Sequence, residues 1–455
     1  MPELLKSVLI ANRGEIALRI IRACKELGIR SVLAYSEADK DSLPVRLADE
    51  AVCIGPALSK LSYRDPMAVI GAALAFKVDA IHPGYGFMAE NPEFAAMSER
   101  EGIIFIGPAS SVIQSMGDKI EAKKIARSAN VPTVPGSVGA ISEHEEALAV
   151  ALEVGFPLLI KAAAGGGGRG MRVVQSVDTL KRDLAEIMAE AEVAFGSPAV
   201  YIERYLTDIR HIEIQVISDG DNVLHLGERD CTAQRRNQKL IEESPSPVLD
   251  DQLRADLATA AVSLCKAVRY KNAGTIEFVF DNVERKFYFI EMNTRIQVEH
   301  PVTEMVTGVD LIKLQLQIAS GQPLTLQQDE IVIDGHAIEC RINAEDPERG
   351  FAPSPGTIAT FRSPGGFGVR MDTHIESNYT IPPYYDSMIG KLICWGRDRE
   401  EAIARMTRAL DEMVVDGVTT TAKFHKSVLN SEKFVSGDFN TSFVSEFLET
   451  TASGK

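Results

Sequence analysis

The chain has 455 residues, which is long enough for two or three compact domains rather than one. Its formal net charge of −16, from 48 basic and 64 acidic side chains, argues against a general nucleic-acid or membrane-surface binder. The N-terminus does not read as a signal peptide, and no apolar run approaches the length of a membrane span. The six cysteines form no C-x-x-C pair, which favours free thiols in a reducing compartment and therefore a cytoplasmic protein.

A β-α-β pattern opens the chain. Apolar runs at residues 7–11 and 30–35 predict strands, and an amphipathic helix at 15–27 lies between them and should end at Gly28. This order implies a parallel sheet with right-handed crossovers. The first turn has one glycine instead of G-x-G-x-x-G, so NAD binding is disfavoured. We place the first domain at residues 1–117.

A helix is expected from about Ser110, with Lys119 inside it. The segment VPTVPGS then predicts a hinge into a small subdomain at about 134–205, within a second domain at 118–330. Here a strand that ends in Lys161 leads into AAAGGGGRG and a second strand, MRVV. Consecutive glycines lose entropy on ordering, but they let backbone N–H groups cradle an anion. The pattern predicts a hairpin that folds over phosphates, with a flexible linker as the alternative.

The third domain is predicted at 331–448, followed by a tail at 449–455. One helix is expected at 303–320 and another at about 399–416, and the chain after Val444 is expected to fray. Arg341 lies near the end of the strand in IVIDGHAIECRINAED, where it could be a surface ion-pair residue. Upstream, four basic residues fall within eleven positions of GERDCTAQRRNQKLIEE, which in an acidic chain indicates an anion site.

The most informative stretch is a predicted hairpin between Gly274 and Pro301. GTIEFVF and KFYFIEMN both alternate with a period of two, and DNVER supplies the turn. The alternation puts Glu277 on one face of the first strand, and Phe287, Phe289, Glu291 and Asn293 together on one face of the second. Two converging carboxylates repel each other, and Mg²⁺ would compensate them. Glu277, Glu291 and Asn293 are therefore candidate metal ligands, although an exposed acidic strand face remains the alternative.

If the chain stays extended past Asn293, then Arg295, Gln297 and Glu299 continue the same line of side chains. A guanidinium binds planar anions in a bidentate manner, and a carboxylate beyond it could serve as a general base. This order of charges predicts an anion site beside the metal site.

EMNTRIQVEHP closely resembles a signature of the biotin carboxylases, which belong to the ATP-grasp superfamily. The resemblance extends through ANRGEIALRI, HPGYGFMAENPEFA, KAAAGGGGRGM, GERDCTAQRRNQKLIEE, IECRINAEDP, FAPSPG and PPYYDSMIGKLI, over nearly the whole chain. It implies an α/β protein with a Rossmann-like N-terminal domain, an ATP-grasp central domain with a mobile glycine-rich lid, and a β-rich C-terminal domain. Asn237 departs from the pattern, since histidine is common there, and Ala164 stands where glycine is frequent.

The resemblance also implies roles for particular residues. Those implied to bind ATP are Lys119, Lys161, Gly167, Gly168, Glu203, Arg204, Tyr205, Leu206, His211, Asn237, Glu277 and Glu291. Those implied to hold bicarbonate are Lys239, Arg295, Gln297 and Val298, with Glu299 as the base that removes its proton. Arg341 would face the ureido oxygen of biotin. Glu299 lies among cations, which should lower its pKa.

The implied reaction is phosphoryl transfer from ATP to bicarbonate, which gives carboxyphosphate, followed by carboxylation of biotin. Its cofactors would be ATP and Mg²⁺ or Mn²⁺, with two ions expected. Its partners would be a second copy of the chain, a biotin carboxyl carrier protein and a carboxyltransferase subunit. The chain has no Met-Lys dipeptide, so the carrier is expected to be separate. Two alternatives stay open: another ATP-grasp ligase, such as an aminoimidazole ribonucleotide carboxylating enzyme, and a regulatory nucleotide-binding subunit without turnover.

Overall fold

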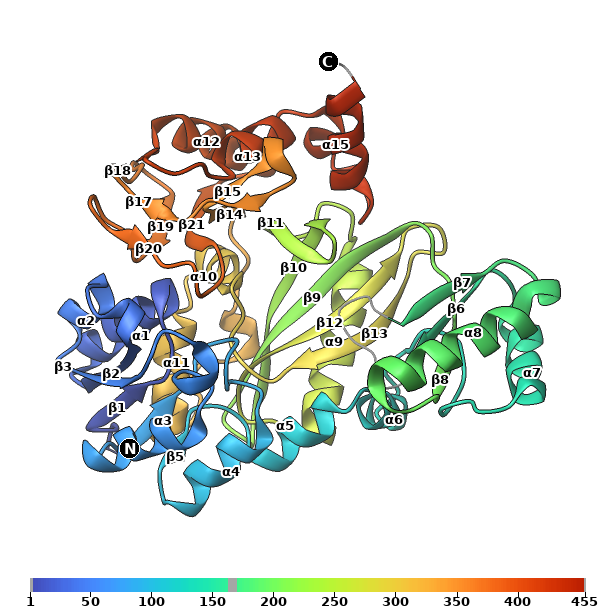
Figure 1. The fold of residues 1–455 in the computed structure, drawn as a ribbon, viewed down its shortest axis with the longest axis horizontal. Helices are drawn as coiled ribbons and strands as arrows, with labels where there is room; N and C mark the ends of the chain where they lie inside the picture. Colours follow the sequence, from blue (N-terminus) through green and yellow to red (C-terminus); the bar gives the residue numbers. More distant parts are fainter. Residues whose placement is uncertain (1–2, 163–169, 454–455) are drawn as a thin grey trace.

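The computed structural model describes residues 3–162 and 170–453. Figure 1 shows an N-terminal α/β unit in blue, a long central sheet in green and yellow, and a C-terminal unit in orange and red. A small unit of three strands and two helices forms the opposite end of the molecule (Figure 1). Among the described residues, we find no helix with the length and apolar character needed to span a membrane.

The N-terminal unit is built on the predicted parallel sheet, whose strands lie in the order β3-β2-β1-β4-β5. The strands are β1 (Ser7–Ile10), β2 (Arg30–Ser36), β3 (Glu50–Gly55), β4 (Ala80–His82) and β5 (Ile104–Phe105). Its helices are α1 (Gly14–Leu27), α2 (Leu43–Leu47), α3 (Pro66–Ala75), α4 (Pro92–Arg100) and α5 (Ser110–Gly117). Helix α1 ends at Gly28 with φ of 71°, as predicted, because glycine adopts the left-handed conformation without strain.

The central sheet has eight strands in the order β13-β12-β9-β10-β11-β14-β21-β19, and every neighbouring pair is antiparallel. Its strands are β9 (Ile209–Ser218), β10 (Val223–Arg235), β11 (Gln238–Ser244), β12 (Asn272–Asp281), β13 (Lys286–Asn293), β14 (His336–Asn343), β19 (Val369–Thr373) and β21 (Met388–Gly396). The pairing of β11 with β14 carries the sheet across the predicted boundary at residues 330 and 331. The second and third units therefore share one sheet, which places side chains from both on the same face.

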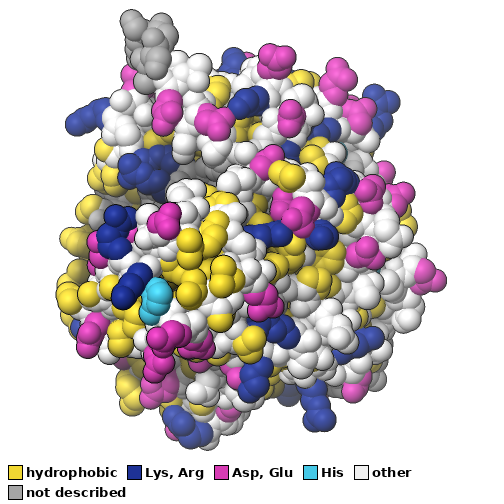
Figure 2. All heavy atoms as spheres, turned by 90° about the vertical axis from the view of Figure 1, so that its right-hand side faces the viewer, with side chains coloured by type: hydrophobic (Ala, Val, Ile, Leu, Met, Phe, Trp, Pro, Cys, Tyr) yellow, Lys and Arg dark blue, Asp and Glu magenta, His cyan; other side chains and the backbone are white. Residues whose placement is uncertain are grey.

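The small unit lies within residues 134–205 and has the strand order β7-β6-β8. It consists of α7 (His144–Val154), β6 (Leu158–Ala162), β7 (Met171–Val174), α8 (Val177–Phe195) and β8 (Val200–Arg204). Its core, which includes Ile160, Leu180 and Ile202, is separate from the other cores. Figure 2 looks at this end of the molecule, where hydrophobic side chains lie exposed among acids and bases. Val138 and Val193 belong to this unit and are 87% and 90% exposed.

The remaining helices pack around these sheets, and short strands edge the C-terminal unit. The helices are α6 (Lys119–Ser128), α9 (Asp251–Ala267), α10 (His300–Thr307), α11 (Leu311–Ala319), α12 (Arg399–Glu412), α13 (Ala422–Leu429), α14 (Glu432–Ser436) and α15 (Phe443–Ser453). The short strands are β15 (Glu345–Asp346), β16 (Ala352–Pro353), β17 (Gly356–Thr357), β18 (Thr360–Arg362), β20 (Thr380–Ile381) and β22 (Val414–Asp416). Single 3₁₀ turns occupy 37–39, 59–61, 328–330 and 347–349.

The bounds predicted for two helices were wrong, because residues that end or cap a helix were overlooked. The predicted helix at 303–320 is two helices, since Gly308 ends α10 in the left-handed conformation and the Asp310 side chain caps α11 through the Lys313 N–H. The predicted helix at 399–416 ends at Glu412, and residues 414–416 form β22 against β18.

Two further expectations about helices were wrong. The helix expected from Ser110 through Lys119 is two helices, since α5 ends at Gly117 and Lys119 is the first residue of α6, which Asp118 caps. The chain after Val444 is helical as far as Ser453 instead of frayed, because Phe447 and Leu448 pack against the C-terminal core.

The central hairpin forms as predicted, but its second strand changes face once. Glu277 pairs with Glu291 and Phe278 pairs with Phe289, so Ile290 is an extra residue that forms a β-bulge. The bulge puts Phe287 and Phe289 in the core, on the face opposite to Glu291. The prediction that Phe287, Phe289, Glu291 and Asn293 share one face was therefore wrong. It assumed that side chains alternate without interruption, and the inserted residue interrupts this alternation.

Candidate active site

A cavity of about 740 Å³ lies over the central sheet and is lined by most of the predicted site residues. The predicted residues in its wall are Lys119, His211, Asn237, Lys239, Glu277, Glu291, Asn293, Arg295, Gln297, Val298, Glu299 and Arg341. They come from α6, β9, the β10–β11 hairpin, β12, β13, the loop after β13, and β14. The candidate metal ligands and the candidate anion-binding residues thus share one cleft.

The predicted metal ligands face each other across β12 and β13. Glu277 and Glu291 are register partners, and Asn293 donates a hydrogen bond of 2.8 Å to Glu277 Oε1. Burial raises the pKa of Glu291, and the negative charge of Glu277 raises it further. A half-buried carboxylate that is held beside another carboxylate is the arrangement that a hard divalent cation stabilises. The oxygen ligands present here fit Mg²⁺.

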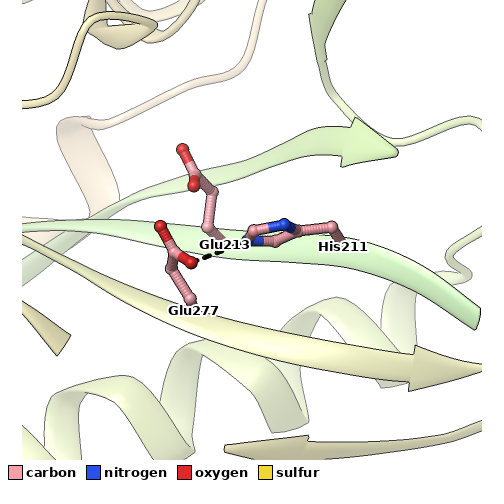
Figure 3. A group of neighbouring side chains, drawn as sticks. All are labelled: His211, Glu213 and Glu277. Carbon is pink, nitrogen blue, oxygen red and sulfur yellow. Dashed lines mark ion pairs between the residues drawn. The ribbon is translucent and has the colours of Figure 1, made fainter. Parts of the chain in front are cut away.

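Glu277 is also surrounded by donors from neighbouring strands. His211 Nε2 lies 2.8 Å from Glu277 Oε2, and Lys239 Nζ lies 3.0 Å from Glu277 Oε1. Figure 3 shows His211 and Glu213 on β9 and Glu277 on β12, with all three side chains on the same side of the sheet. Burial would raise the pKa of Glu277, but Lys239 and His211 outweigh it and hold this pKa well below its usual value.

The ligand atoms of His211, Glu213 and Glu277 lie within 4.8 Å of one another, which is close enough to hold an ion. The Lys239 ammonium, however, already bonds Glu213 Oε2 at 2.7 Å and Glu277 at 3.0 Å. A second cation at that point would be repelled by the lysine. The charge distribution therefore favours a metal on the Glu291 side of Glu277.

Arg229, one of the four basic residues predicted to form an anion site, is instead buried among protein side chains and does not line the cavity. Arg229 is fully buried and donates to Glu213 at 2.5 Å and to Gln297 at 3.0 Å, besides Gln215, Thr275 and Thr303. It links β9, β12 and the loop after β13 beneath the cavity. The alternation of HIEIQV, which puts His211, Glu213 and Gln215 on one face, was the available signal for this layer.

The chain after Asn293 is not extended, so the predicted continuous line of side chains was wrong. Residues 294 and 295 form a bend, residues 298 and 299 form a turn, and Glu299 lies at the N-cap of α10. The side chains still converge, because Arg295 donates to Asn293 Oδ1 at 3.0 Å and Gln297 donates to Glu277 Oε1 at 2.7 Å. These contacts bring the candidate anion-binding groups close to the candidate metal ligands.

Glu299 is buried between two cations. Its Oε1 accepts from Lys239 at 2.6 Å and its Oε2 accepts from Arg341 at 2.9 Å. Burial would raise the pKa of Glu299, but the charges of Lys239 and Arg341 hold it below the usual value, as the sequence predicted. Arg341 is held on its other side by Glu242 at 2.6 Å.

Glu242 is an unpredicted titrating group beside Arg341. Burial and the charge of Glu299 raise the pKa of Glu242 to about 7, although Arg341 opposes the shift. One of its oxygens, Oε2, is buried without a hydrogen bond. It lies three residues after Lys239, and no sequence pattern distinguishes it from the neighbouring Glu243.

The residues predicted to contact the nucleotide lie partly outside the cavity wall. Lys161 Nζ is 2.5 Å from Glu203 Oε2, and Lys123 also pairs with Glu203. Burial lowers the pKa of Lys161 to about 8, and the charge of Lys119 lowers it further. Lys123 was not predicted, although its position one helical turn after Lys119 was the signal.

The other residues predicted to contact the nucleotide lie at or after the end of β8 and in the β10–β11 turn. Arg204 points toward β12 and β13, where it bonds Glu284 at 2.8 Å and the Tyr288 hydroxyl at 3.1 Å. Tyr205 and Leu206 directly follow β8, and the Tyr205 N–H donates to the Pro157 carbonyl. Asn237 lies in the β10–β11 turn with φ of 64°, a conformation that asparagine tolerates better than most residues. Gly167 and Gly168 lie outside the described residues.

Three family models match the chain in succession. Residues 4–113 match the biotin carboxylase N-terminal domain, residues 118–327 match the carbamoyl-phosphate synthase L chain ATP-binding domain, and residues 339–446 match the biotin carboxylase C-terminal domain. The chain is 55% identical to Biotin carboxylase 1 of Bacillus subtilis over 98% of its length and 99% of the relative. It is 54% identical to Biotin carboxylase of Pseudomonas aeruginosa, with the same coverage.

Solved structures agree with this assignment. A biotin carboxylase complex with β,γ-ATP from Campylobacter jejuni is 48% identical with a TM-score of 0.91, over 97% of this chain and 99% of that one. The biotin carboxylase domain dimer of Hydrogenobacter thermophilus 2-oxoglutarate carboxylase, in complex with MgADP, ADP and bicarbonate, is 47% identical with a TM-score of 0.90, over 98% of both chains. Because the likeness covers the whole fold at high identity, the chain belongs to the biotin carboxylase family of ATP-grasp enzymes.

Proposed function

We propose that the protein catalyses ATP- and bicarbonate-dependent carboxylation of biotin through carboxyphosphate. The observation that carries this proposal is the single cavity that holds the acid pair Glu277 and Glu291 together with Arg295, Glu299 and Arg341. Such a cavity offers a metal–nucleotide site and a small-anion site within reach of each other. The family assignment argues against the other ATP-grasp ligase considered above.

We propose that Glu277, Glu291 and Asn293 hold Mg²⁺, or Mn²⁺ in its place, with two ions bound during turnover. A bound divalent ion neutralises phosphate charge and aligns the γ-phosphoryl group for transfer. The relative whose structure contains MgADP supports magnesium as the ion. His211 and Lys239 would then exchange their contacts with Glu277 for contacts with nucleotide oxygens.

The nucleotide would lie between the central sheet and the small unit. Lys119 and Lys161 supply positive charge on either side, and Glu203 with the backbone after β8 would bind the base. Gly167 and Gly168 would contribute backbone N–H groups to the phosphates. We propose that the small unit moves as a lid, which would exclude water from a reactive anhydride.

Bicarbonate would bind at the turn after β13. Arg295 and Gln297 offer side-chain donors, Val298 offers its backbone, and Lys239 offers an ammonium. Glu299 would accept the bicarbonate proton at a carboxylate oxygen while the hydroxyl oxygen bonds to the γ-phosphorus. The bond from this phosphorus to the β,γ-bridging oxygen breaks, and ADP leaves. Because its pKa is held low, Glu299 acts through positioning rather than through intrinsic basicity. Arg341 would stabilise the negative charge that develops on the biotin ureido oxygen.

We also propose that the biotin is carried by a separate carrier protein and that the chain works with a carboxyltransferase as a homodimer. A relative from Methanothermobacter thermautotrophicus, which is named as one subunit of a pyruvate carboxylase, is 53% identical, and a relative of known structure is a domain dimer. The six cysteines are free, which supports a cytoplasmic location.

The proposal is tested by measuring ATP hydrolysis by the purified protein with bicarbonate and free biotin, and by detecting carboxybiotin with ¹⁴C-bicarbonate. Hydrolysis should require Mg²⁺ and bicarbonate, and biotin should increase it. The proposal would be wrong if the protein binds ATP but produces no bicarbonate-dependent phosphate and no labelled biotin.

A further inference from the structure

A buried ammonium lies directly beneath the anion site. Lys391 on β21 is fully buried, and its Nζ donates to the Val298 carbonyl at 2.8 Å. The same Nζ is 3.2 Å from Glu15 Oε1 on α1. Burying a charge is costly unless it is paired and hydrogen-bonded, so a lysine at this place requires a specific reason.

The contacts of Lys391 determine the orientation of the backbone on one side of Val298. A trans peptide is planar, with its carbonyl and its N–H on opposite sides. Because the Val298 carbonyl is bound by Lys391, the peptide that joins Val298 to Glu299 is held in one orientation. The same peptide carries the N–H of Glu299, which is the N-cap residue of α10.

The other side of Val298 is held in the same way. The Gln297 carbonyl lies 2.8 Å from His300 Nδ1, which must carry the proton because the carbonyl can only accept. Holding this carbonyl turns the Val298 N–H in the opposite direction. Both peptides that flank Val298 are therefore oriented by buried side chains, at a residue that lines the cavity.

Glu15 ties this arrangement to the N-terminal unit. The Tyr85 hydroxyl donates to Glu15 Oε1, and Tyr85 itself lines the cavity. Lys391 comes from the C-terminal part of the shared sheet, Glu15 and Tyr85 come from the N-terminal unit, and Val298 follows β13. Three parts of the chain thus meet at one carbonyl of the anion-binding turn.

We infer that Lys391 is a positioning residue, which orients the Val298 backbone for binding of the small oxyanion through its hydrogen bond to the Val298 carbonyl. This inference rests on the proposed function, since it assigns the oxyanion as bicarbonate. The lysine does not touch the substrate. It acts by keeping the turn in its binding conformation before the anion arrives, which lowers the cost of binding.

The test uses Lys391→Met, which keeps an unbranched side chain that is one heavy atom shorter and removes its donor and its charge. Losing a charge-assisted hydrogen bond should raise the KM for bicarbonate about tenfold or more. The KM for ATP should stay within about twofold of the wild-type value, because the Lys391 ammonium contacts Val298 and Glu15, which are not among the residues assigned to the nucleotide. Lys433→Met is the matched control, since Lys433 is exposed and pairs only with Glu446 among the described residues.

Lys391→Met also leaves the Glu15 carboxylate buried without its cation, so the double variant Lys391→Met with Glu15→Gln is measured in parallel. The second change removes the unpaired charge and should restore thermal stability, but not the bicarbonate KM. The inference is refuted if folded Lys391→Met, or the folded double variant, has the bicarbonate KM of the wild type. It is also refuted if both variants unfold at the assay temperature, because Lys391 would then be a structural residue. If the wild-type enzyme itself shows no bicarbonate dependence, the proposed function fails instead.

Discussion

Replacing Glu299 by Gln is the most direct perturbation of the proposed chemistry. The side chain is 2% exposed and lies 2.6 Å from Lys239 Nζ and 2.9 Å from an Arg341 nitrogen. Glutamine keeps the shape and one acceptor oxygen, but it cannot take the bicarbonate proton. A positioned general base contributes about 10²- to 10⁴-fold, which corresponds to about 3 to 5 kcal/mol in the activation free energy.

The assay compares phosphate release with bicarbonate and free biotin against equilibrium binding of ATP. The kcat of Glu299→Gln should fall at least about 100-fold, while the dissociation constant for ATP stays within about threefold because the substitution leaves the nucleotide contacts in place. Glu190→Gln is the matched control, since Glu190 is exposed and pairs with Arg172 on the small unit. A Glu299→Gln variant that binds ATP and retains full carboxylation of biotin would refute the assignment of Glu299 as the base.

Three further outcomes are expected. Glu242→Gln should flatten the pH dependence of stability, which urea unfolding of both proteins at several pH values measures. The pKa of Glu242 is about 7 in the folded state, so the folded state binds more protons than the unfolded state. The unfolding free energy of the wild type should therefore fall by up to about 3 kcal/mol as pH rises from 4.5 to 7, and that of the variant should not. Gly136→Ala should raise the KM for ATP several-fold and lower the unfolding free energy by about 1–3 kcal/mol, because a Cβ at Gly136 meets the Ile202 carbonyl and lies 2.9 Å from Glu203 Cα. ATP titration measures the first effect and thermal unfolding measures the second. Wild-type values in both measurements would contradict this prediction. Glu291→Gln should weaken Mn²⁺ binding about tenfold by titration followed by water-proton relaxation, because it removes one of two facing carboxylates, and unchanged affinity would exclude Glu291 as a ligand.

Local pattern was sufficient to predict the parallel opening sheet, the hairpin and the convergence of its acids. Those features depend on periods of two and 3.6 residues and on turn residues close in sequence. The same rule failed at Ile290, since a bulge inserts one residue without any change in composition. The acids nevertheless face each other because Glu277, Glu291 and Asn293 all lie on the same side of the bulge.

The long-range contacts in the layer beneath the cavity were not accessible to sequence analysis. Arg229 reaches Gln297, and Lys391 reaches both Glu15 and Val298, across separations of tens to hundreds of residues. From sequence alone, a lysine in an apolar strand such as MIGKLICW would be expected at the exposed edge of a sheet. The strand lies inside an eight-stranded sheet, however, and Lys391 is fully buried. Such assignments require the tertiary fold, because only the fold decides which face of a central strand meets another unit.

The charge balance of the cavity explains how an acidic protein can bind anions. Lys239 contacts Glu213, Glu277 and Glu299, so its positive charge is largely neutralised before substrates bind. A divalent cation that takes over Glu277 removes one of these acids from the lysine and leaves the ammonium available to an anion. The acids therefore do not oppose anion binding. They hold the basic side chains in place, and the same groups would form an anion site once a metal and a nucleotide bind.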